Sequence, residues 1–145
     1  MIDQLAREER RLAMPLILAI SDAPLLVEAL AHDLAGTAVV CRFPAGREDP
    51  RGLVAQVAPD LVLVDRRHEA EALESFDLPL VHVLVERRSV RARREDGWHE
   101  FAIPDASTAA IRNVLLGELF AAAANRRLRA TPRAEALTEA RPGGN

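Results

Sequence analysis

The chain has 145 residues, of which 49% are hydrophobic and 28% charged, and a formal net charge of −3. This length and composition predict one folded domain with a single hydrophobic core, and they exclude a disordered or fibrous chain. Apolar stretches such as residues 13–20 and 61–64 are too short to span a bilayer, and no leader-like segment opens the chain, so we expect a cytoplasmic protein. The slightly negative charge gives no general attraction for nucleic acid, whose binding would need a local basic patch.

The residue types that are rare or missing narrow the chemistry further. All 19 basic residues are arginines, so chemistry that depends on a lysine is excluded. Cys41 is a lone cysteine in a predicted strand, where we expect a small buried side chain rather than a redox group. The four histidines are not spaced as metal ligands, and His82, within a strand, is expected to be a core residue.

Apolar runs alternate with helical patterns along the chain. After a charged, helix-favouring extension over residues 1–13, apolar runs predict strands at 16–20, 37–43, 61–64, 80–85 and 99–103. Helical patterns are expected at 24–35, around 51–58, at 69–76, within an arginine-rich crossover over 86–98, and from Ser107 or Thr108 to about Leu128. We expect a folded domain over residues 14–128 and a mobile tail over 129–145.

This alternation is typical of a doubly wound α/β domain with a parallel sheet. Residues 61–64 are apolar without interruption, as expected of a central strand that helices cover on both faces. Ligands of such sheets bind at the carboxyl ends of the strands. At those ends the predicted strands place Ser21, Asp22, Asp65, Val85, Glu86, Ile103 and Pro104.

Three segments resemble parts of the response-regulator receiver superfamily. Residues 18–30 resemble the first strand and helix of a receiver, residues 59–65 the strand that delivers its phospho-acceptor aspartate, and residues 101–104 its last strand. Their order and spacing extend the resemblance over residues 14–125. The resemblance implies a flavodoxin-like sheet of five parallel strands in the order 2-1-3-4-5.

In a working receiver an aspartate accepts a phosphoryl group while Mg²⁺ and a lysine neutralise the transferring oxygens. The resemblance makes Asp65 the acceptor position and Asp22 the remaining metal ligand, with Ser21 in place of the other acid. Two carboxylates would hold Mg²⁺ only weakly, with Glu86 as a further oxygen donor. Other working positions are replaced: the lysine by Ile103, the hydroxyl residue by Val85 and the aromatic switch residue by Glu100. We therefore expect a degenerate receiver that is not an enzyme and requires no cofactor.

Both acids also have a purely structural interpretation, which we favour. Asp65 is then a strand-end acid that accepts hydrogen bonds from nearby amides or pairs with Arg66 or Arg67. Asp22 is then the N-cap of the following helix. Phosphorylation of Asp65 with Mg²⁺ stays open as the alternative.

The densest charge run consists of Arg87, Arg88, Arg91, Arg93 and Arg94. Its simplest interpretation is a solvated helix face. The alternative is a docking surface for an acidic partner or a phosphate backbone, to which Arg126, Arg127 and Arg129 would add. The chain has only four Phe and one Trp, so it lacks the aromatic series that stacks bases.

Receivers commonly form homodimers through the face of the fourth helix, fifth strand and fifth helix. Here that face would carry Trp98, Phe101, Val114, Leu115 and Leu119, although the leucines would equally serve to cover the sheet. Residues 84–89 and the helix after Pro104 also resemble, more narrowly, the receiver-like part of transcription antitermination regulators. Three functions follow: a protein-interaction module, a receiver phosphorylated on Asp65, and an RNA-binding or transcription-regulation partner that uses the arginines.

Overall fold

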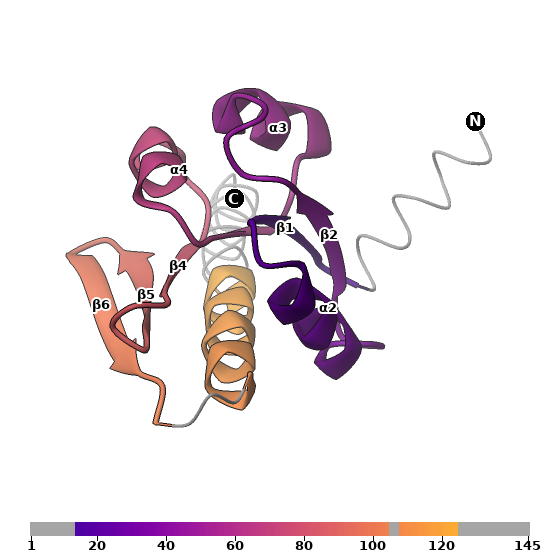
Figure 1. Ribbon diagram of the computed structural model, residues 1–145, viewed down its shortest axis with the longest axis vertical. Helices are drawn as coiled ribbons and strands as arrows, with labels where there is room; N and C mark the ends of the chain where they lie inside the picture. Colours follow the sequence, from indigo (N-terminus) through magenta and orange to yellow (C-terminus); the bar gives the residue numbers. More distant parts are fainter. Residues whose placement is uncertain (1–13, 105–107, 125–145) are drawn as a thin grey trace, which may run out of the picture.

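The computed structural model describes residues 14–104 and 108–124, and the statements below refer to them. One six-stranded sheet forms the centre, with strands in the order β2-β1-β3-β4-β5-β6 (Figure 1). The strands are β1 (Leu16–Ile20), β2 (Val39–Phe43), β3 (Leu61–Val64), β4 (Leu80–Leu84), β5 (Ser89–Arg94) and β6 (Gly97–Ala102). The helices are α2 (Pro24–Asp33), α3 (Pro50–Val57), α4 (Arg67–Ala72) and a further helix over residues 109–124. The predicted extension 1–13 and tail 129–145 lie outside the described residues.

The first four strands form the predicted doubly wound half of the sheet. β1 pairs in parallel with both β2 and β3, and β3 pairs in parallel with β4. The α/β class and the order 2-1-3-4 are therefore confirmed. Helices α2, α3 and α4 supply the connections, because parallel neighbours need a crossover that returns the chain to the same edge.

Beyond β4 the predicted architecture is wrong. Residues 89–94 form strand β5, antiparallel to β4, where an arginine-rich helical crossover was expected. β6 covers most of the predicted last strand but pairs antiparallel with β5. The sheet is therefore six-stranded and mixed, not five-stranded and parallel, and no helix lies between β4 and β6.

The pattern of alternate residues explains why residues 89–102 form a hairpin. Val90 and Ala92 are fully buried, while the residues that alternate with them, Arg91 and Arg93, face the other side of the sheet. This period of two is typical of a strand. The run of arginines makes the alternation hard to recognise in the sequence. Gly97 (φ +120°) follows a two-residue loop and adopts a backbone conformation that side chains rarely allow.

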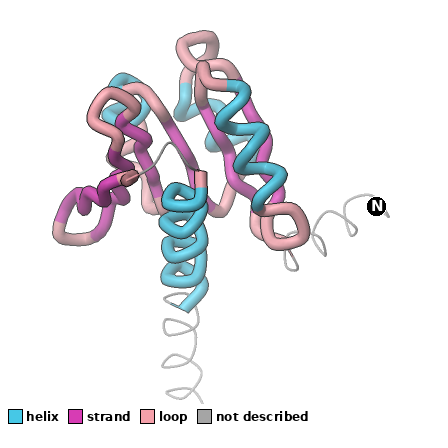
Figure 2. The backbone as a smooth tube through the Cα atoms, turned by 60° about the horizontal axis from the view of Figure 1, so that its bottom comes forward, coloured by secondary structure: helices cyan, strands magenta, loops and turns pink. Residues whose placement is uncertain are grey.

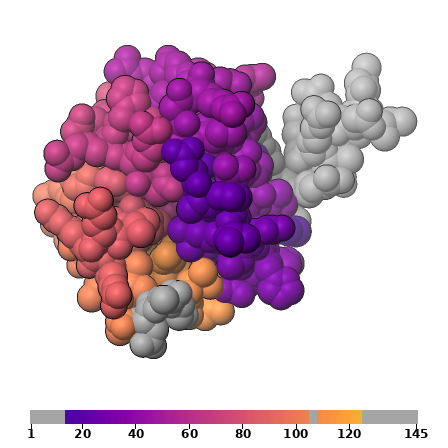
Figure 3. Space-filling model, in the orientation of Figure 1, coloured from indigo at the N-terminus to yellow at the C-terminus, as the bar shows by residue number. Residues whose placement is uncertain are grey.

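Helices cover both faces of the sheet, and each face has its own core (Figures 1 and 2). On one face, α2 and the helix over residues 109–124 pack on the strands, with Leu30 and Leu115 fully buried. On the other face, α3 and α4 pack through Leu53 and Leu73. In Figure 3 the β5–β6 hairpin forms one flank of the visible surface, and α2 and β2 form the other. No helix within the described ranges is long and apolar enough to cross a membrane.

Candidate functional site at the carboxyl edge of the sheet

The parallel strands β1 and β3 end at the same edge and bring together the residues predicted from the ends of these strands. Ser21 and Asp22 directly follow β1, and Asp65 directly follows β3. The register pairs Ile20 with Val64, so the residues after each strand lie side by side. The predicted proximity of Ser21, Asp22 and Asp65 is therefore confirmed.

Asp65 is tied to β1 through one carboxylate oxygen. The Ser21 hydroxyl donates to Asp65 Oδ2 at 2.6 Å, and the backbone N–H of Asp22 donates to the same oxygen at 3.2 Å. Ser21 is 2% exposed, and its Oγ also accepts from the backbone N–H of Ala23 at 2.9 Å. The other oxygen, Asp65 Oδ1, is buried and has no hydrogen-bond partner among the described residues. Asp65 thus accepts from an amide, as the structural interpretation predicts, but makes no ion pair with Arg66 or Arg67.

Asp22 is turned away from Asp65 and is not the helix cap. Its Oδ1 accepts from the backbone N–H of Ala45 at 3.2 Å, and its Oδ2 pairs with Arg66 Nη1 at 3.4 Å. The N-cap of α2 is Ala23, which makes no side-chain capping bond, and Pro24 begins the helix. The predicted capping role of Asp22 is therefore wrong, because its carboxylate instead ties β1 to the loop after β2.

Arg66, directly after Asp65, contacts two acids, Asp22 after β1 and Glu69 in α4. Its Nη1 reaches Asp22, and its Nε lies 3.6 Å from Oε1 of Glu69, a side chain only 1% exposed. The guanidinium crosses Gly46 (φ +75°), where a Cβ atom would lie 2.8 Å from Arg66 Nη1. A side chain at position 46 would therefore collide with the Arg66 guanidinium. From the sequence, Arg66 is expected only as a partner for Asp65, and no pattern relates it to Gly46.

Most of the acidic oxygens at this edge already accept from protein donors. Asp65 Oδ2 accepts from Ser21 and Asp22, and both oxygens of Asp22 are held by Ala45 and Arg66. The buried Oδ1 of Asp65 and both carboxylate oxygens of Glu69 have no hydrogen-bond donor among the described residues, although Glu69 Oε1 lies 3.6 Å from Arg66 Nε. Among the described residues, no group of three or more His, Cys, Asp or Glu side chains is placed to hold a metal ion.

The other positions predicted from the receiver resemblance lie apart from Asp65 or face solvent. Val85, after β4, is 64% exposed, and Glu86 follows it in the turn to β5. Glu100 lies on β6 and Ile103 directly follows it. β6 is three places from β3 in the sheet, about 14 Å away at the usual strand spacing. The mapping of Ile103 and Glu100 beside the acceptor is therefore wrong, because β5 intervenes.

The arginine run is a strand and its turn, not a solvated helix face. Arg88 (φ 51°) lies in the turn, and Arg87 pairs with Glu100 across the hairpin at 3.3 Å. Arg93 donates to four backbone carbonyls: Leu73 at 2.9 Å, Glu74 at 2.5 Å, Leu78 at 2.6 Å, and Phe76. Arg94 pairs with Glu118 of the helix over residues 109–124 at 3.2 Å. Arg91 donates to His82 Nδ1 at 3.0 Å. Four of the five arginines thus have specific protein partners.

The side chains predicted to form a dimer face are divided between the core and the surface. Leu115 is fully buried and Leu119 is 5% exposed, so both cover the sheet, and Val114 packs against the same core. Trp98 packs against the core of the opposite face. Phe101 alone of this set is exposed, at 37%.

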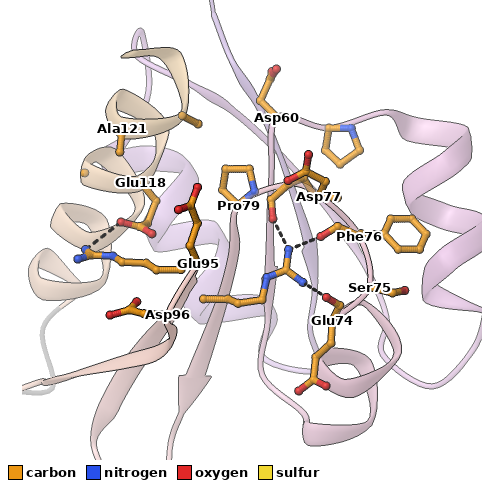
Figure 4. Close-up of a pocket in the computed structure, with 16 residues that line it drawn as sticks. Asp60, Glu74, Ser75, Phe76, Asp77, Pro79, Glu95, Asp96, Glu118 and Ala121 are labelled. Carbon is orange, nitrogen blue, oxygen red and sulfur yellow. Dashed lines mark hydrogen bonds and ion pairs between the residues drawn. The ribbon is translucent and has the colours of Figure 1, made fainter. Parts of the chain in front are cut away.

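A cavity of about 1090 Å³ lies at the opposite edge of the sheet from Asp65, between the start of β4 and the helix over residues 109–124. Figure 4 shows acids around it from several elements: Asp60, Glu74, Asp77, Glu95, Asp96 and Glu118. Arg93 and Arg94 also line it, but both are held by protein acceptors. This cavity is acidic and lies away from Asp65.

A scan against protein-family models and searches of curated proteins and of solved structures found no match for this chain.

Proposed function

We propose that this protein is a receiver-like regulatory module that acts by binding another protein, and that it does not take up phosphate at Asp65. The observation that carries the proposal is the 2.6 Å hydrogen bond from Ser21 Oγ to Asp65 Oδ2. Ser21 occupies the position at which a receiver has a second metal-binding acid. Its hydroxyl donates to the Asp65 carboxylate, which is the group that would have to attack phosphorus.

The surroundings of Asp22 support the same function. A metal-assisted phosphoryl transfer needs carboxylates that are free to coordinate Mg²⁺ and a cation that meets the transferring oxygens. Asp22 accepts from Ala45 and pairs with Arg66 instead, so the positive charge near the site comes from the protein itself. The residues present therefore do not fit a magnesium site.

The direct test is exposure to a small phosphoryl donor. The full chain is incubated with acetyl phosphate and Mg²⁺, and its intact mass is recorded over time. We expect no phosphoryl adduct. An adduct that is absent from the Asp65→Asn variant would overturn the proposal and establish the phosphorylated-receiver alternative.

A gain-of-function variant sharpens this test. Arg66→Ala removes the cation from Asp22, and Ser21→Asp adds the missing acid. We expect Mg²⁺ titration to perturb amide signals near residues 21, 22 and 65 in the double variant and to leave them unchanged in the native chain. Equal Mg²⁺ responses in both proteins would show that the native edge already binds the ion.

The homodimer and the RNA-binding function remain predictions from the sequence. The exposed aromatic side chains near the predicted dimer face are Phe101 on β6 and Phe120 on the helix over residues 109–124, which are 37% and 67% exposed. For RNA, the prediction is salt-sensitive binding that weakens when Arg87 and Arg88 become Glu.

A further inference from the structure

Three arginines from three different elements converge on one open cavity of about 510 Å³. The cavity lies where β3 and β4 end and the chain turns into β5. Arg67 comes from the start of α4, Arg87 from the turn, and Arg91 from β5. Its walls are formed by Asp65, Arg67, His82, Val83, Leu84, Val85, Glu86, Arg87 and Arg91.

Arg91 has a fixed orientation in this cavity. Its Nε–H donates to His82 Nδ1 at 3.0 Å, and its guanidinium lies 4.1 Å from the centre of the Trp98 ring. These two contacts leave its terminal amino groups without an acceptor among the described residues. A guanidinium held in this way loses little rotational freedom when an anion binds to it.

The two neighbouring arginines have only exposed ion-pair partners: Arg67 lies 3.8 Å from Glu71, and Arg87 lies 3.3 Å from Glu100. Such exposed pairs are weak, so both guanidiniums can still donate to an anion. Burial lowers the pKa of Arg91, and the positive charge of Arg67 is the next cause. His82 adds no negative charge: burial, followed by the charge of Arg91, lowers its pKa to about 4, so the ring is neutral at pH 7. Because Nδ1 accepts from Arg91, the proton of the neutral ring lies on Nε2.

Two carboxylates also line the cavity and limit what it can bind. Asp65 directs Oδ2 towards Ser21, and Glu86 lies in the turn. With three arginines, the formal charge of the lining is +1. A net charge this small does not hold a polyanion by attraction alone, so a ligand must accept directional hydrogen bonds from the guanidiniums.

We propose that this cavity binds a small phosphate-type oxyanion, either inorganic phosphate or a phosphomonoester, through Arg67, Arg87 and Arg91. A phosphate group has enough terminal oxygens to accept from three guanidiniums, whereas a carboxylate is satisfied by one bidentate arginine. The volume is in the range of small-molecule sites. This binding is non-covalent and does not depend on whether the protein has a protein partner.

The test is an amide NMR titration of the full chain at constant ionic strength with EDTA and without Mg²⁺. Inorganic phosphate and free phosphoserine are titrated separately, which distinguishes the ion from a phosphomonoester. We expect saturable shifts confined to residues 65–67 and 82–91. A lower dissociation constant for phosphoserine indicates that the organic part also contacts the cavity, and equal constants indicate that phosphate alone is recognised; both outcomes support the site.

Matched variants establish whether the arginines carry the binding. Arg67 and Arg87 have side chains that are 81% and 68% exposed, so Arg67→Gln and Arg87→Gln should leave the fold intact. Each is expected to weaken binding by roughly threefold to tenfold, as for the loss of one charge-assisted hydrogen bond at an exposed site. Arg112→Gln, on the helix over residues 109–124, removes the same charge elsewhere and should not change the affinity.

The site would be ruled out by the absence of saturable shifts, or by an equal loss of affinity in Arg112→Gln. Shifts at these residues with a short RNA but not with phosphate would overturn the small-ligand site in favour of a nucleic-acid surface. Because no phosphoryl donor or Mg²⁺ is present, neither result bears on the phosphorylation of Asp65.

Discussion

Ser21 shows how one hydroxyl changes the chemistry of a strand end. It is buried, and it accepts from the Ala23 amide while it donates to Asp65. A carboxylate at position 21 would instead bring two negative charges together, and their repulsion costs free energy unless one carboxyl is protonated or a cation lies between them. Ser21 avoids this repulsion, and Arg66 offsets the charge of Asp22.

His82 is expected to make the protein sensitive to mild acid. Burial and Arg91 lower its pKa from 6.5 to about 4, so between these pH values the unfolded chain binds more protons than the folded protein. Stability should fall as the pH drops from about 6.5 to about 4, by up to roughly 3 kcal/mol from this group. Urea unfolding at pH 7 and pH 4.5 measures the loss.

The control for this prediction is an exposed histidine of the same chain. His82→Gln should reduce the loss of stability between the two pH values, whereas His68→Gln, on the exposed side of α4, should retain it. An undiminished loss in His82→Gln would mean that other groups cause the acid sensitivity. The comparison between variants matters because carboxylates titrate in the same range.

Arg93 connects β5 to the loop between α4 and β4, and we call its set of hydrogen bonds the Arg93 clamp. Its guanidinium donates to the carbonyls of Leu73, Glu74, Phe76 and Leu78, at the end of α4 and in the loop that follows. Of these four, the Leu73 carbonyl also accepts from the backbone N–H of Phe76 at 3.1 Å. Arg93→Ala should lower the free energy of unfolding by about 2–4 kcal/mol, since bonds to a charged donor are lost together.

Two variants separate the role of this clamp from the loss of a charge. Arg93→Lys keeps the charge but cannot reach four carbonyls, so it should recover less than half of the loss. Arg112→Ala, at a half-buried position on the last described helix, should change stability by less than about 0.5 kcal/mol. Full recovery by lysine in urea unfolding would contradict the clamp.

The β5–β6 hairpin depends on the backbone conformation of Gly97. At φ +120° an alanine is strained even though no atom lies within 4 Å of its added Cβ. Gly97→Ala should therefore destabilise the protein by about 1–2 kcal/mol. Gly117→Ala is the matched change at an exposed helical position that also has open space, and it should stabilise by up to about 1 kcal/mol. Thermal unfolding should shift in opposite directions; shifts of the same sign would contradict the assignment of β5 and β6 as a tight hairpin.

At the scale of the whole molecule, the helices that cover the two faces of the sheet bury some side chains and leave others exposed to a partner. Leu115, on the helix over residues 109–124, is fully buried against the sheet, whereas Phe120 on the same helix is 67% exposed. Leu115→Ala should lower the free energy of unfolding by about 2–5 kcal/mol, whereas Phe120→Ala should change it by less than about 0.5 kcal/mol.

Sedimentation of the same two variants addresses the predicted homodimer. If the native chain sediments as a dimer, Phe120→Ala should shift the equilibrium towards the monomer while its unfolding is unchanged. A dimer that Leu115→Ala weakens with no loss of monomer stability would contradict the buried position of Leu115.

The strands and helices between residues 14 and 84 follow from local patterns in the sequence. The uninterrupted apolar run at Leu61–Val64 predicts a strand covered on both faces, and the structure buries all four residues. Because parallel strands end at a common edge, the proximity of Ser21, Asp22 and Asp65 also follows. The hairpin does not follow from the sequence in the same way. Five arginines among residues 87–94 suggest a solvated helix, and only Val90 and Ala92 show the alternation of a strand.

Local sequence thus determined the α/β class and the residues at the carboxyl ends of the first strands, whereas the order of the first four strands was predicted from the resemblance to receivers. Tertiary structure alone decided the direction of β5 and β6, the pairing of Asp22 with Arg66, and the cavity around Arg91. The reason is physical: apolar periodicity reports which face of an element is buried, whereas the partners of a long charged side chain depend on segments that are distant in sequence. Arg67, Arg87 and Arg91 are separated by up to 24 positions, and only the turn from β4 into β5 brings them to one site.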